Sequence, residues 1–360
     1  MTNNNYVAIM AGGVGSRFWP ASRTSKPKQF LDILGVGKSL LRLTFERFLA
    51  VCPAENILIV TNELYKDLVL EHLPELKPNQ ILCEPSRNNT APSVAYTAFR
   101  LKSMNPDANF VIAPSDHVIL NEPEFVRIIK KALDFTAKND ALLTLGIEPT
   151  RPDTGYGYIN FDQKNVTDNI FKVKKFTEKP NRQTAQQFID SNEYLWNAGI
   201  FVWSADSILS SLQKNAPEVY AILEKGISDY NTDREAAFIE INYPKTPNIS
   251  IDYAVAERAD NIYTIPSQFG WSDLGTWGSL HAEATQDDAQ NVVQGDSVIL
   301  QNVSDCLVRV PKHKLVVLRD LHDYIVVDED DVLLIFPKSS EQEIKKVTQD
   351  IEKTLGSGFL

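Results

Sequence analysis

The segment YVAIMAGGVGSRFWPASRTSKPKQFL (Tyr6–Leu31) decides the fold prediction. Its apolar run YVAIM predicts a buried strand and is followed at once by Gly12, Gly13 and Gly15. Glycine has no Cβ, so its backbone can turn tightly and let a ligand approach the main-chain N–H groups. Four cations and no carboxylate complete the stretch: Arg17, Arg23, Lys26 and Lys28. A basic, glycine-rich turn after a strand predicts a phosphate site, and a mobile surface loop is the alternative.

Two common phosphate-binding motifs do not fit this segment. A Walker loop needs two glycines separated by four residues and followed by lysine and serine or threonine, and no such run is present. A dinucleotide fingerprint needs G-x-G-x-x-G leading straight into a helix, whereas Gly13 and Gly15 are followed by Phe18 at the third glycine position and then by Pro20.

The first half of the chain alternates between strand and helix patterns. Apolar strand-like runs begin at Tyr6, Asn56, Asn109 and Ala141. Helical patterns lie between them, one capped by Ser39 and one capped by Thr90 with Pro92 in its first turn. This alternation predicts an α/β fold, a Rossmann-like, mostly parallel sheet flanked by helices. Ligands of such sheets lie beyond the carboxyl ends of the strands, where the glycine loop and PSDH (residues 114–117) follow their strands.

The sequence pattern changes after about Asn291, where short strand-like segments alternate with polar turns. Apolar residues recur every eight or nine positions, at Leu307, Val316, Ile325 and Leu333. This spacing suggests stacked coils of a β-helix, with a sandwich or small barrel as alternatives. A terminal helix follows, for which Ser340 and Glu343 form a candidate capping box. We therefore expect a catalytic domain over residues 1–288 and a β-rich, possibly β-helical C-terminal domain over residues 289–360.

Composition excludes several function classes. The 360 residues carry a formal net charge of −11 and a pI of about 5.1, which argues against a nucleic-acid binder. No apolar run approaches the ~20 residues that span a bilayer, and the N-terminus lacks a basic segment typical of a signal peptide. We expect a cytoplasmic protein with no membrane or nucleic-acid partner. Cys52, Cys83 and Cys306 are in no paired spacing, so neither a disulfide nor a zinc site is expected.

The pattern G-G-x-G-x-R, a proline and then Pro27-Lys28 resembles the signature of the sugar-1-phosphate nucleotidylyltransferases. Eight blocks in order, from Ala11 to Trp277, resemble the mannose-1-phosphate guanylyltransferase branch of that family: GSRFWPASRTSKPKQFL, EPSRNNTAP, PSDH, TGYGYI, FTEKP, WNAGIF, IDYAVAER and WSDLGTW. The likeness beyond Asn291 is looser.

The resemblance implies a reaction and a set of site residues. GTP and mannose 1-phosphate would give GDP-mannose and pyrophosphate by direct displacement at the α-phosphorus, with Mg²⁺. The implied catalytic cations are Arg17 and Lys28, and the implied metal ligands are Asp116 and Asp273. The implied nucleotide-binding residues are Gly12, Gly13, Gly15, Arg87, Asn88 and Thr90. The implied sugar-phosphate-binding residues are Gly157, Glu178, Lys179 and Asn197.

Alternatives remain for several of these residues. Asp116 could cap the next turn, Glu178 and Lys179 could form an exposed ion pair, and Arg87 and Asn88 could belong to a solvated helix cap. At the level of function, the alternatives are a nucleotidylyltransferase for another sugar 1-phosphate or nucleotide, and a non-catalytic nucleotide-sugar sensor. The β-rich tail is a candidate surface for a homodimer.

Overall fold

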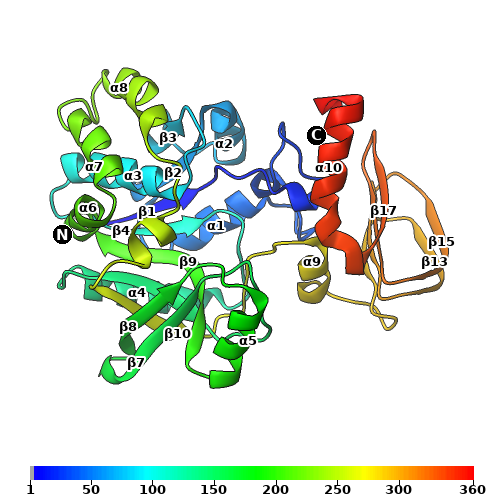
Figure 1. The fold of residues 1–360 in the computed structure, drawn as a ribbon. Coiled ribbons are helices and arrows are strands. Elements are labelled where there is room, and N and C mark those ends of the chain that lie inside the picture. Colours follow the sequence, from blue (N-terminus) through cyan, green and yellow to red (C-terminus); the bar gives the residue numbers. More distant parts are fainter. Residues whose placement is uncertain (1–3) are drawn as a thin grey trace. The chain divides into compact units, whose positions relative to one another are not determined.

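The computed structural model describes residues 4–360, and their packing divides the chain into two compact units (Figure 1). Unit 1 contains the N-terminal segment to Gly12, Thr44–Ser115 and Ile119–Trp271. Unit 2 contains Gly13–Leu43, Asp116–Val118 and Ser272–Leu360. Most of the predicted phosphate loop therefore packs in one unit with the C-terminal β segment. The domain boundary between residues 288 and 289 stays a prediction, because packing does not test which parts fold separately.

Unit 1 is built on a nine-stranded sheet. Its strands, in spatial order, are β3 (Ile81–Glu84), β2 (Ile57–Asn62), β1 (Asn5–Met10), β4 (Asn109–Pro114), β9 (Tyr194–Ser204), β6 (Leu142–Ile147), β10 (Ile262–Ser267), β8 (Ile170–Thr177) and β7 (Tyr158–Thr167). The strands expected at Tyr6, Asn56, Asn109 and Ala141 are confirmed as β1, β2, β4 and β6. The central residues of β1 are fully buried, as expected for a strand with both faces covered.

The sheet is mixed, which corrects the mostly parallel sheet expected from the sequence. Strands β3, β2, β1 and β4 run parallel, but β9 pairs antiparallel with both β4 and β6. Strands β7 and β8 also pair antiparallel. They are joined by Asp168 and Asn169, which have φ of 51° and 59°. Two consecutive residues with positive φ make the tight hairpin turn that reverses the chain, so no crossover helix is needed here.

Helices of unit 1 enclose its core. They are α2 (Lys66–His72), α3 (Thr90–Met104), α4 (Glu122–Thr136), α5 (Arg182–Ser191), α6 (Ala205–Asn215), α7 (Pro217–Leu223) and α8 (Glu235–Asn242). Helix α3 is buried from Ala91 to Leu101 because α6 and α7 pack on it. Helix α4 contacts β4, β6, β9 and β10. Helix α1 (Leu40–Phe48) spans the sequence boundary between the units, as do the two-residue strands β5 (Val118–Ile119) and β11 (Trp271–Ser272).

The two predicted helix caps have different outcomes. The Ser39 Oγ accepts the backbone N–H of Arg42 at 3.3 Å, so Ser39 caps α1 as expected. Thr90 is not the cap of α3: Asn89 occupies that position, and its side chain accepts the N–H of Thr90. Asn89 reaches a φ of 67°, a conformation that asparagine tolerates better than threonine, and this explains the shift by one residue.

Unit 2 packs the predicted phosphate loop onto a small β structure. Its elements are α9 (Trp277–Glu283), β12 (Val292–Gln294), β13 (Val298–Ser304), β14 (Leu307–Arg309), β15 (Val316–His322), β16 (Tyr324–Asp328), β17 (Leu333–Pro337) and α10 (Ile344–Leu355). The core joins Phe18, Trp19 and Leu31 of the loop to Trp277 and Leu307. The indole Nε1 of Trp277 donates to the carbonyl of Trp19 at 3.2 Å.

Strand pairing in unit 2 is mainly parallel. Val298 pairs with Val316 and Leu307 pairs with Ile325, each across 18 residues, while β16 and β17 pair antiparallel. The C-terminal segment is thus β-rich, as expected. The predicted capping box is wrong: residues Lys338–Glu343 form a 3-10 helix, and α10 begins at Ile344 with no side-chain cap. The Glu341 carboxylate instead accepts the N–H of Gly278 at 2.6 Å. This contact with α9 holds the 3-10 helix that leads into α10.

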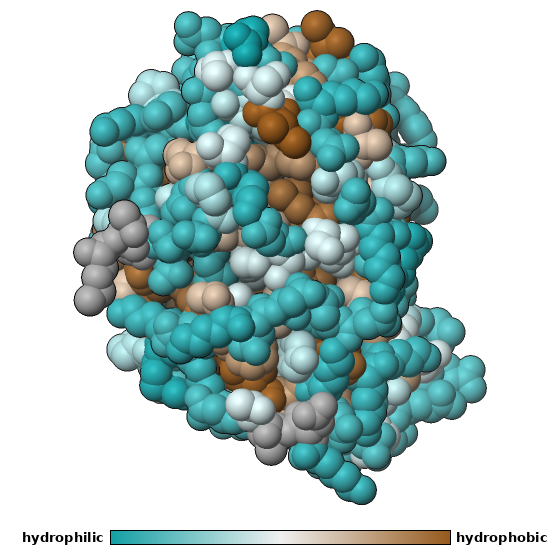
Figure 2. All heavy atoms as spheres, turned by 90° about the vertical axis from the view of Figure 1, so that its left-hand side faces the viewer, coloured by the Kyte–Doolittle hydropathy of each residue, from teal (hydrophilic) through white to brown (hydrophobic). Residues whose placement is uncertain are grey.

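On the face drawn in Figure 2, hydrophilic residues predominate and hydrophobic residues lie in small separate groups. Within residues 4–360, no helix combines the length and apolar character needed to cross a membrane.

Candidate active site

Lys28 is the most buried of the four predicted loop cations. Its side chain is buried, and its Nζ donates to Asp116 Oδ2 at 2.9 Å and to the carbonyl of Asp273 at 3.0 Å. The ring centroid of Phe18 lies 5.2 Å from the same Nζ, a favourable cation–π distance. The ammonium group is therefore held in one place by a carboxylate, a carbonyl and an aromatic face of unit 2.

Gly15 makes room for Lys28. It has a φ of +73°, and a Cβ added to it would lie 2.4 Å from Lys28 Cβ. The N–H of Lys28 donates to the carbonyl of Val14 at 3.0 Å, and Ser22 Oγ donates to the carbonyl of Gly15 at 2.6 Å. Only glycine satisfies both the positive φ and the close approach, so this predicted loop glycine has a defined structural requirement.

Asp116 keeps a charged carboxylate. Desolvation by burial raises its pKa, but attraction to Lys28 and His117 and the hydrogen bond from Lys28 outweigh that effect, so the net pKa of Asp116 lies below its usual range. About a third of its side chain is exposed (33%). A charged, partly exposed oxygen beside a fixed ammonium can bind a further cation or polar group.

Arg17 and the carboxylate of Asp273 flank Gly275. A Cβ on Gly275 would lie 3.0 Å from Asp273 Oδ2 and 3.2 Å from Arg17 Nη1. The N–H of Gly275 donates to Asp273 Oδ1 at 3.1 Å. Arg17 is exposed, unlike Lys28. The structure thus brings Arg17, Lys28, Asp116 and Asp273 together within unit 2.

Arg23 has a different position from these four residues. Its guanidinium binds both carboxylate oxygens of Asp331, at 2.8 and 2.5 Å. Its Nε donates to the carbonyl of Pro20 at 3.1 Å. This bidentate pair connects the loop to the C-terminal β segment, so Arg23 has a structural contact.

The predicted sugar residues gather in unit 1. Glu178 is buried, and its Oε1 accepts the ammonium of Lys179 at 2.7 Å. A Cβ on Gly157 would lie 2.6 Å from Glu178 Oε2. The carbonyl of Gly157 accepts the N–H of Asn197 at 2.8 Å. Glu178 and Lys179 do form an ion pair, as the alternative proposed, but with the carboxylate buried and only the lysine exposed.

Asn197 is also buried, with its amide oriented by hydrogen bonds. Its Oδ1 accepts the hydroxyl of Thr144 at 2.7 Å, and its Nδ2 donates to Asp252 Oδ1 at 3.0 Å. Two effects raise the pKa of Asp252: burial of its carboxyl group, which is the larger, and repulsion from Glu178. Sequence reasoning missed Asp252 and Thr144, although Asp252 lies in the block IDYAVAER. A carboxylate within an otherwise apolar run was the available signal.

The predicted base-binding residues are largely engaged inside unit 1. Asn88 Nδ2 donates to the carbonyl of Thr246 at 2.7 Å, and its Oδ1 accepts from Ser86 at 2.8 Å. Thr90 Oγ1 accepts the N–H of Ile251 at 2.8 Å. Arg87 is exposed and donates to the Tyr65 hydroxyl at 2.7 Å. These contacts hold neighbouring segments together, and a nucleotide contact by the three residues stays a prediction.

Glu84 is a buried carboxylate that sequence reasoning did not single out. Its Oε1 accepts the hydroxyls of Ser93 and Tyr243. Its Oε2 lies 3.6 Å from the position of a Cβ on Gly12, beside the first predicted loop glycine. Burial raises the pKa of Glu84 to about 7, and the two hydroxyl donors oppose this rise. Its protonation therefore changes near neutral pH.

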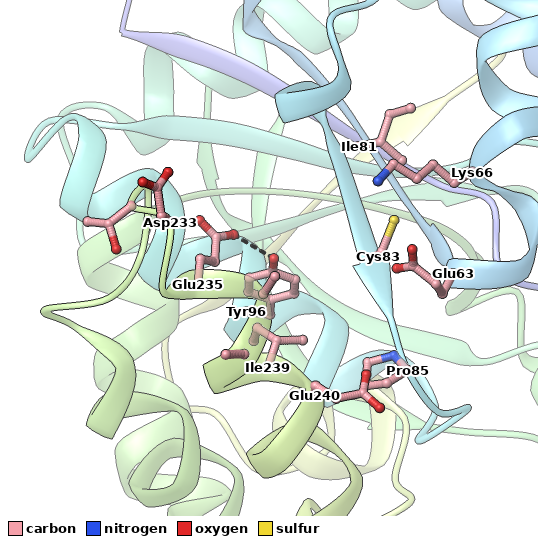
Figure 3. Close-up of a pocket in the computed structure, with 13 residues that line it drawn as sticks. Glu63, Lys66, Ile81, Cys83, Pro85, Tyr96, Asp233, Glu235, Ile239 and Glu240 are labelled. Carbon is pink, nitrogen blue, oxygen red and sulfur yellow. Dashed lines mark hydrogen bonds between the residues drawn. The ribbon is translucent and has the colours of Figure 1, made fainter.

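A separate pocket of about 580 Å³ lies where β3, α3 and α8 meet (Figure 3). None of the predicted site residues lines it. Tyr96 donates to Glu235 at 2.6 Å on one wall, and Cys83 lies on another. Burial raises the pKa of Cys83 to about 12, so its thiol stays protonated and is a poor nucleophile.

The residues near Lys28 fit a magnesium ion better than zinc. Asp116 and Asp273 offer carboxylate oxygens, which Mg²⁺ favours together with substrate phosphates and water. Among residues 4–360, no group of three or more His, Cys, Asp or Glu side chains is arranged to hold a metal.

Comparisons with known proteins agree with this architecture. Residues 6–291 match the family model described as nucleotidyl transferase. A Salmonella montevideo protein called mannose-1-phosphate guanylyltransferase is 37% identical over 352 residues, covering 96% of this chain and 73% of that protein. An Escherichia coli K12 protein of the same name is 34% identical over 357 residues, with coverages of 96% and 73%.

A solved structure is similar over nearly the whole chain. It is from Thermus thermophilus and is described as a mannose-1-phosphate geranyltransferase. The TM-score is 0.87 at 27% identity, and the match covers 97% of this chain and all of that chain. The likeness therefore extends over both units of the present structure.

Proposed function

The chain belongs to the nucleotidyl transferase family, and on that basis we propose that it transfers GMP from GTP to α-D-mannose 1-phosphate, producing GDP-mannose and pyrophosphate. The names of its relatives support this substrate pair. The structural observation that carries the proposal is the position of Lys28, a buried ammonium fixed between Asp116 and the Asp273 carbonyl in a glycine loop.

The chemistry requires two anions to meet. An oxygen of the sugar phosphate attacks the α-phosphorus of GTP, the new P–O bond forms, and the bond to the β-phosphate oxygen breaks to release pyrophosphate. Fixed cations reduce the repulsion between the reactants and stabilise the charge that builds on the leaving group. In this proposal Lys28 neutralises the α-phosphate. Arg17 and the N–H groups of Gly12, Gly13 and Gly15 hold the departing phosphates.

The carboxylates have a different task. Asp116 and Asp273 would hold Mg²⁺, which when bound neutralises phosphate oxygens and polarises the phosphorus. The lowered pKa of Asp116 supports this assignment, because a metal ligand must be ionised. The Asp116 side chain is also partly exposed, so a metal ion can approach it.

The sugar is recognised in unit 1 in this proposal. Lys179, whose side chain is about half exposed (53%), binds the sugar phosphate. The Oε2 of the buried Glu178 lies beside Gly157 and accepts hydroxyl groups of the sugar. Asn197 adds an amide donor. We retain Arg87, Asn88 and Thr90 as candidates beside the base, although the carbonyls of residues 243–246 already occupy the Asn88 amide.

Pyrophosphate release measured over a grid of nucleoside triphosphates and sugar 1-phosphates with Mg²⁺ tests the proposal. The expected result is the highest kcat/KM with GTP and mannose 1-phosphate. A preference for dTTP or glucose 1-phosphate would instead identify another nucleotidylyltransferase. Binding of GDP-mannose without pyrophosphate release in either direction would identify a non-catalytic sensor.

We also propose that the C-terminal strands form a short β-helix that joins two copies of the chain. The 18-residue parallel register supports the coil. Ile299 and Val317 lie side by side in that register and are about half exposed (48% and 55%), which suits a self-association surface. Light scattering should give twice the chain mass, and Val317→Asp should give the monomer. A monomeric parent protein would refute the dimer. The cytoplasmic location expected from the sequence stays part of this proposal.

A further inference from the structure

The side-chain amide of Asn197 has nearly all its hydrogen-bonding capacity assigned within the protein. Its Oδ1 accepts from the Thr144 hydroxyl at 2.7 Å and from the N–H of Gly199 at 3.1 Å. Its Nδ2 donates to Asp252 Oδ1 at 3.0 Å. An amide oxygen has two lone pairs and an amide nitrogen two hydrogens. One N–H is therefore left for a substrate, while the Thr144 hydroxyl, which has a single hydrogen, is shared between Asn197 Oδ1 and the carbonyl of Ile200 at 3.1 Å.

The backbone of β9 is irregular around Asn197. Between Asn197 and Phe201, β9 has two more residues than the facing stretch of β6, where Thr144 pairs with Phe201 and Gly146 with Asn197. Gly199, within this bulge, has a φ of +68°. Bulges redirect side chains and are frequent beside functional sites. The bulge turns the Gly199 N–H back to the Asn197 side chain.

Asp252 begins a single π-helical turn, Asp252–Ala256. Such turns are rare and are found mostly at functional sites. The residue before it, Ile251, is fixed by its N–H bond to Thr90 at 2.8 Å. The turn thus places the Asp252 carboxylate on the amide of Asn197 from a segment 55 residues away in sequence.

Charged groups around Asp252 belong to the same predicted sugar region. Glu178 lies close enough to raise the pKa of Asp252 by repulsion, and Lys179 opposes that effect. Ser250 also donates to the carboxyl group. With an acceptor at Glu178 and a single donor at Asn197, the region offers complementary groups to neighbouring hydroxyls of one sugar ring.

We propose that Asp252 is a positioning residue that holds the Asn197 amide so that its one remaining N–H is presented to a hydroxyl oxygen of the sugar, and thereby sets the discrimination between sugar 1-phosphates. Without Asp252 the Nδ2 side of the amide would lose its acceptor, and the amide, held only at Oδ1, could twist and misdirect its N–H. This inference rests on the proposed function, because it assigns the substrate of Asn197 to the sugar 1-phosphate.

The test compares Asp252→Ala and Asp252→Asn in the full-length protein, with kcat/KM measured for mannose 1-phosphate and for its epimer glucose 1-phosphate. Asp252→Ala should lower the ratio of the two values about tenfold, the effect of one oriented hydrogen bond. The KM for GTP should stay within about twofold. Asp252→Asn retains an oxygen acceptor and should keep most of the ratio.

Asp260→Asn is the matched control, since it removes an exposed carboxylate eight residues away that pairs only with lysines among its described partners. It should leave the ratio unchanged. A merely structural role for Asp252 would lower the thermal midpoint and affect both sugars equally. A folded Asp252→Ala protein with an unchanged ratio therefore overturns the inference. If that variant does not fold, Thr144→Val, which removes the bond to the other side of the amide, should produce the same loss.

Failure of the proposed function gives a different result. If the parent protein prefers another sugar 1-phosphate, the same ratio is measured for that sugar and its epimer, and the Asp252 inference is still tested. If no pair releases pyrophosphate, calorimetric titration of GDP-mannose replaces kinetics, and Asp252→Ala should weaken binding about tenfold. Equal binding by parent and variant overturns the positioning role, and absence of binding by the parent overturns both proposals.

Discussion

Lys28 and Asp116 form an ion pair across 88 positions of sequence, with Nζ 2.9 Å from Oδ2. The same ammonium donates to the carbonyl of Asp273, so one side chain connects three segments of unit 2. Because contacts within the folded chain fix this ammonium group, the cation needs little reorganisation when a phosphate binds. Such preorganisation is the main way in which fixed charges lower a reaction barrier.

Replacing Lys28 by methionine should reduce kcat on the order of 100-fold, about 3 kcal/mol of transition-state stabilisation. The KM for GTP should change less, because the charge is most valuable while the phosphorus is under attack. Initial rates of pyrophosphate release measure both constants. Lys26→Met is the control, because it removes an exposed lysine of the same loop. Its kcat and its KM for GTP should stay close to those of the parent protein. Equal kcat values for the two variants would contradict the role of Lys28.

Replacing Asp116 by asparagine should raise the Mg²⁺ concentration needed for half-maximal rate and lower the maximal rate, because a neutral amide is a poorer ligand. The measurement is rate against free Mg²⁺ at saturating substrates. Asp331→Asn, which breaks the pair with Arg23, should leave the Mg²⁺ midpoint unchanged. An Asp116→Asn protein with the parent's Mg²⁺ curve would show that the metal assignment is wrong.

Gly15→Ala should lower the free energy of unfolding by at least about 1–2 kcal/mol, since alanine is strained at positive φ. Its Cβ would also meet Lys28 at 2.4 Å. Chemical denaturation, followed by fluorescence, measures the change. Gly13→Ala is the stability control, because nothing lies within 4 Å of a Cβ there and its φ is not positive. Equal losses at both positions would rule out this account of Gly15.

The raised pKa of Glu84 should make the stability of the protein depend on pH. Its pKa of about 7 in the folded protein lies above the ordinary value of 4.5, so the folded state binds the proton more tightly. The resulting stabilisation is fully present below about pH 4.5 and is lost as the pH rises through 7. Between pH 4.5 and 8 the parent should lose up to ~3 kcal/mol relative to Glu84→Gln. Denaturation curves of both proteins measure this difference, and parallel pH profiles would contradict it.

Local sequence patterns predicted much of the fold because they reflect short-range physics. The apolar runs at β1, β2, β4 and β6 are buried strands, and Ser39 caps α1. The position of β9 was not predictable in the same way. Its residues are as apolar as those of a parallel strand, and its antiparallel place between β4 and β6 depends on the path of the chain after the β7–β8 hairpin.

The residues of the candidate site were likewise predictable from the sequence only in part. Glycine and cation spacing predicted the loop, and block resemblance predicted Glu178 and Asn197 as sugar-binding residues, a role that stays a prediction. Neither singled out Glu84 or Asp252, because an acidic residue gives no direct sign of its own burial, and the apolar neighbours of Asp252 were the available local signal. The two carboxyl groups became evident through their contacts with Ser93, Tyr243 and Asn197. Conversely, Asn88 had suitable chemistry for a base, but its amide hydrogen bonds are made with the chain itself.

By itself, the sequence determined the alternation of strands and helices, the glycine-rich basic loop and the family, since these depend on residue type and near-neighbour spacing. Only the tertiary structure decided that Gly13–Leu43 packs with Ser272–Leu360, that Arg23 anchors to Asp331 and that Lys28 meets Asp116. The physical reason is that a charge finds its partner through the path of the folded backbone. Spacing along the chain does not encode contacts across 88 or 308 residues.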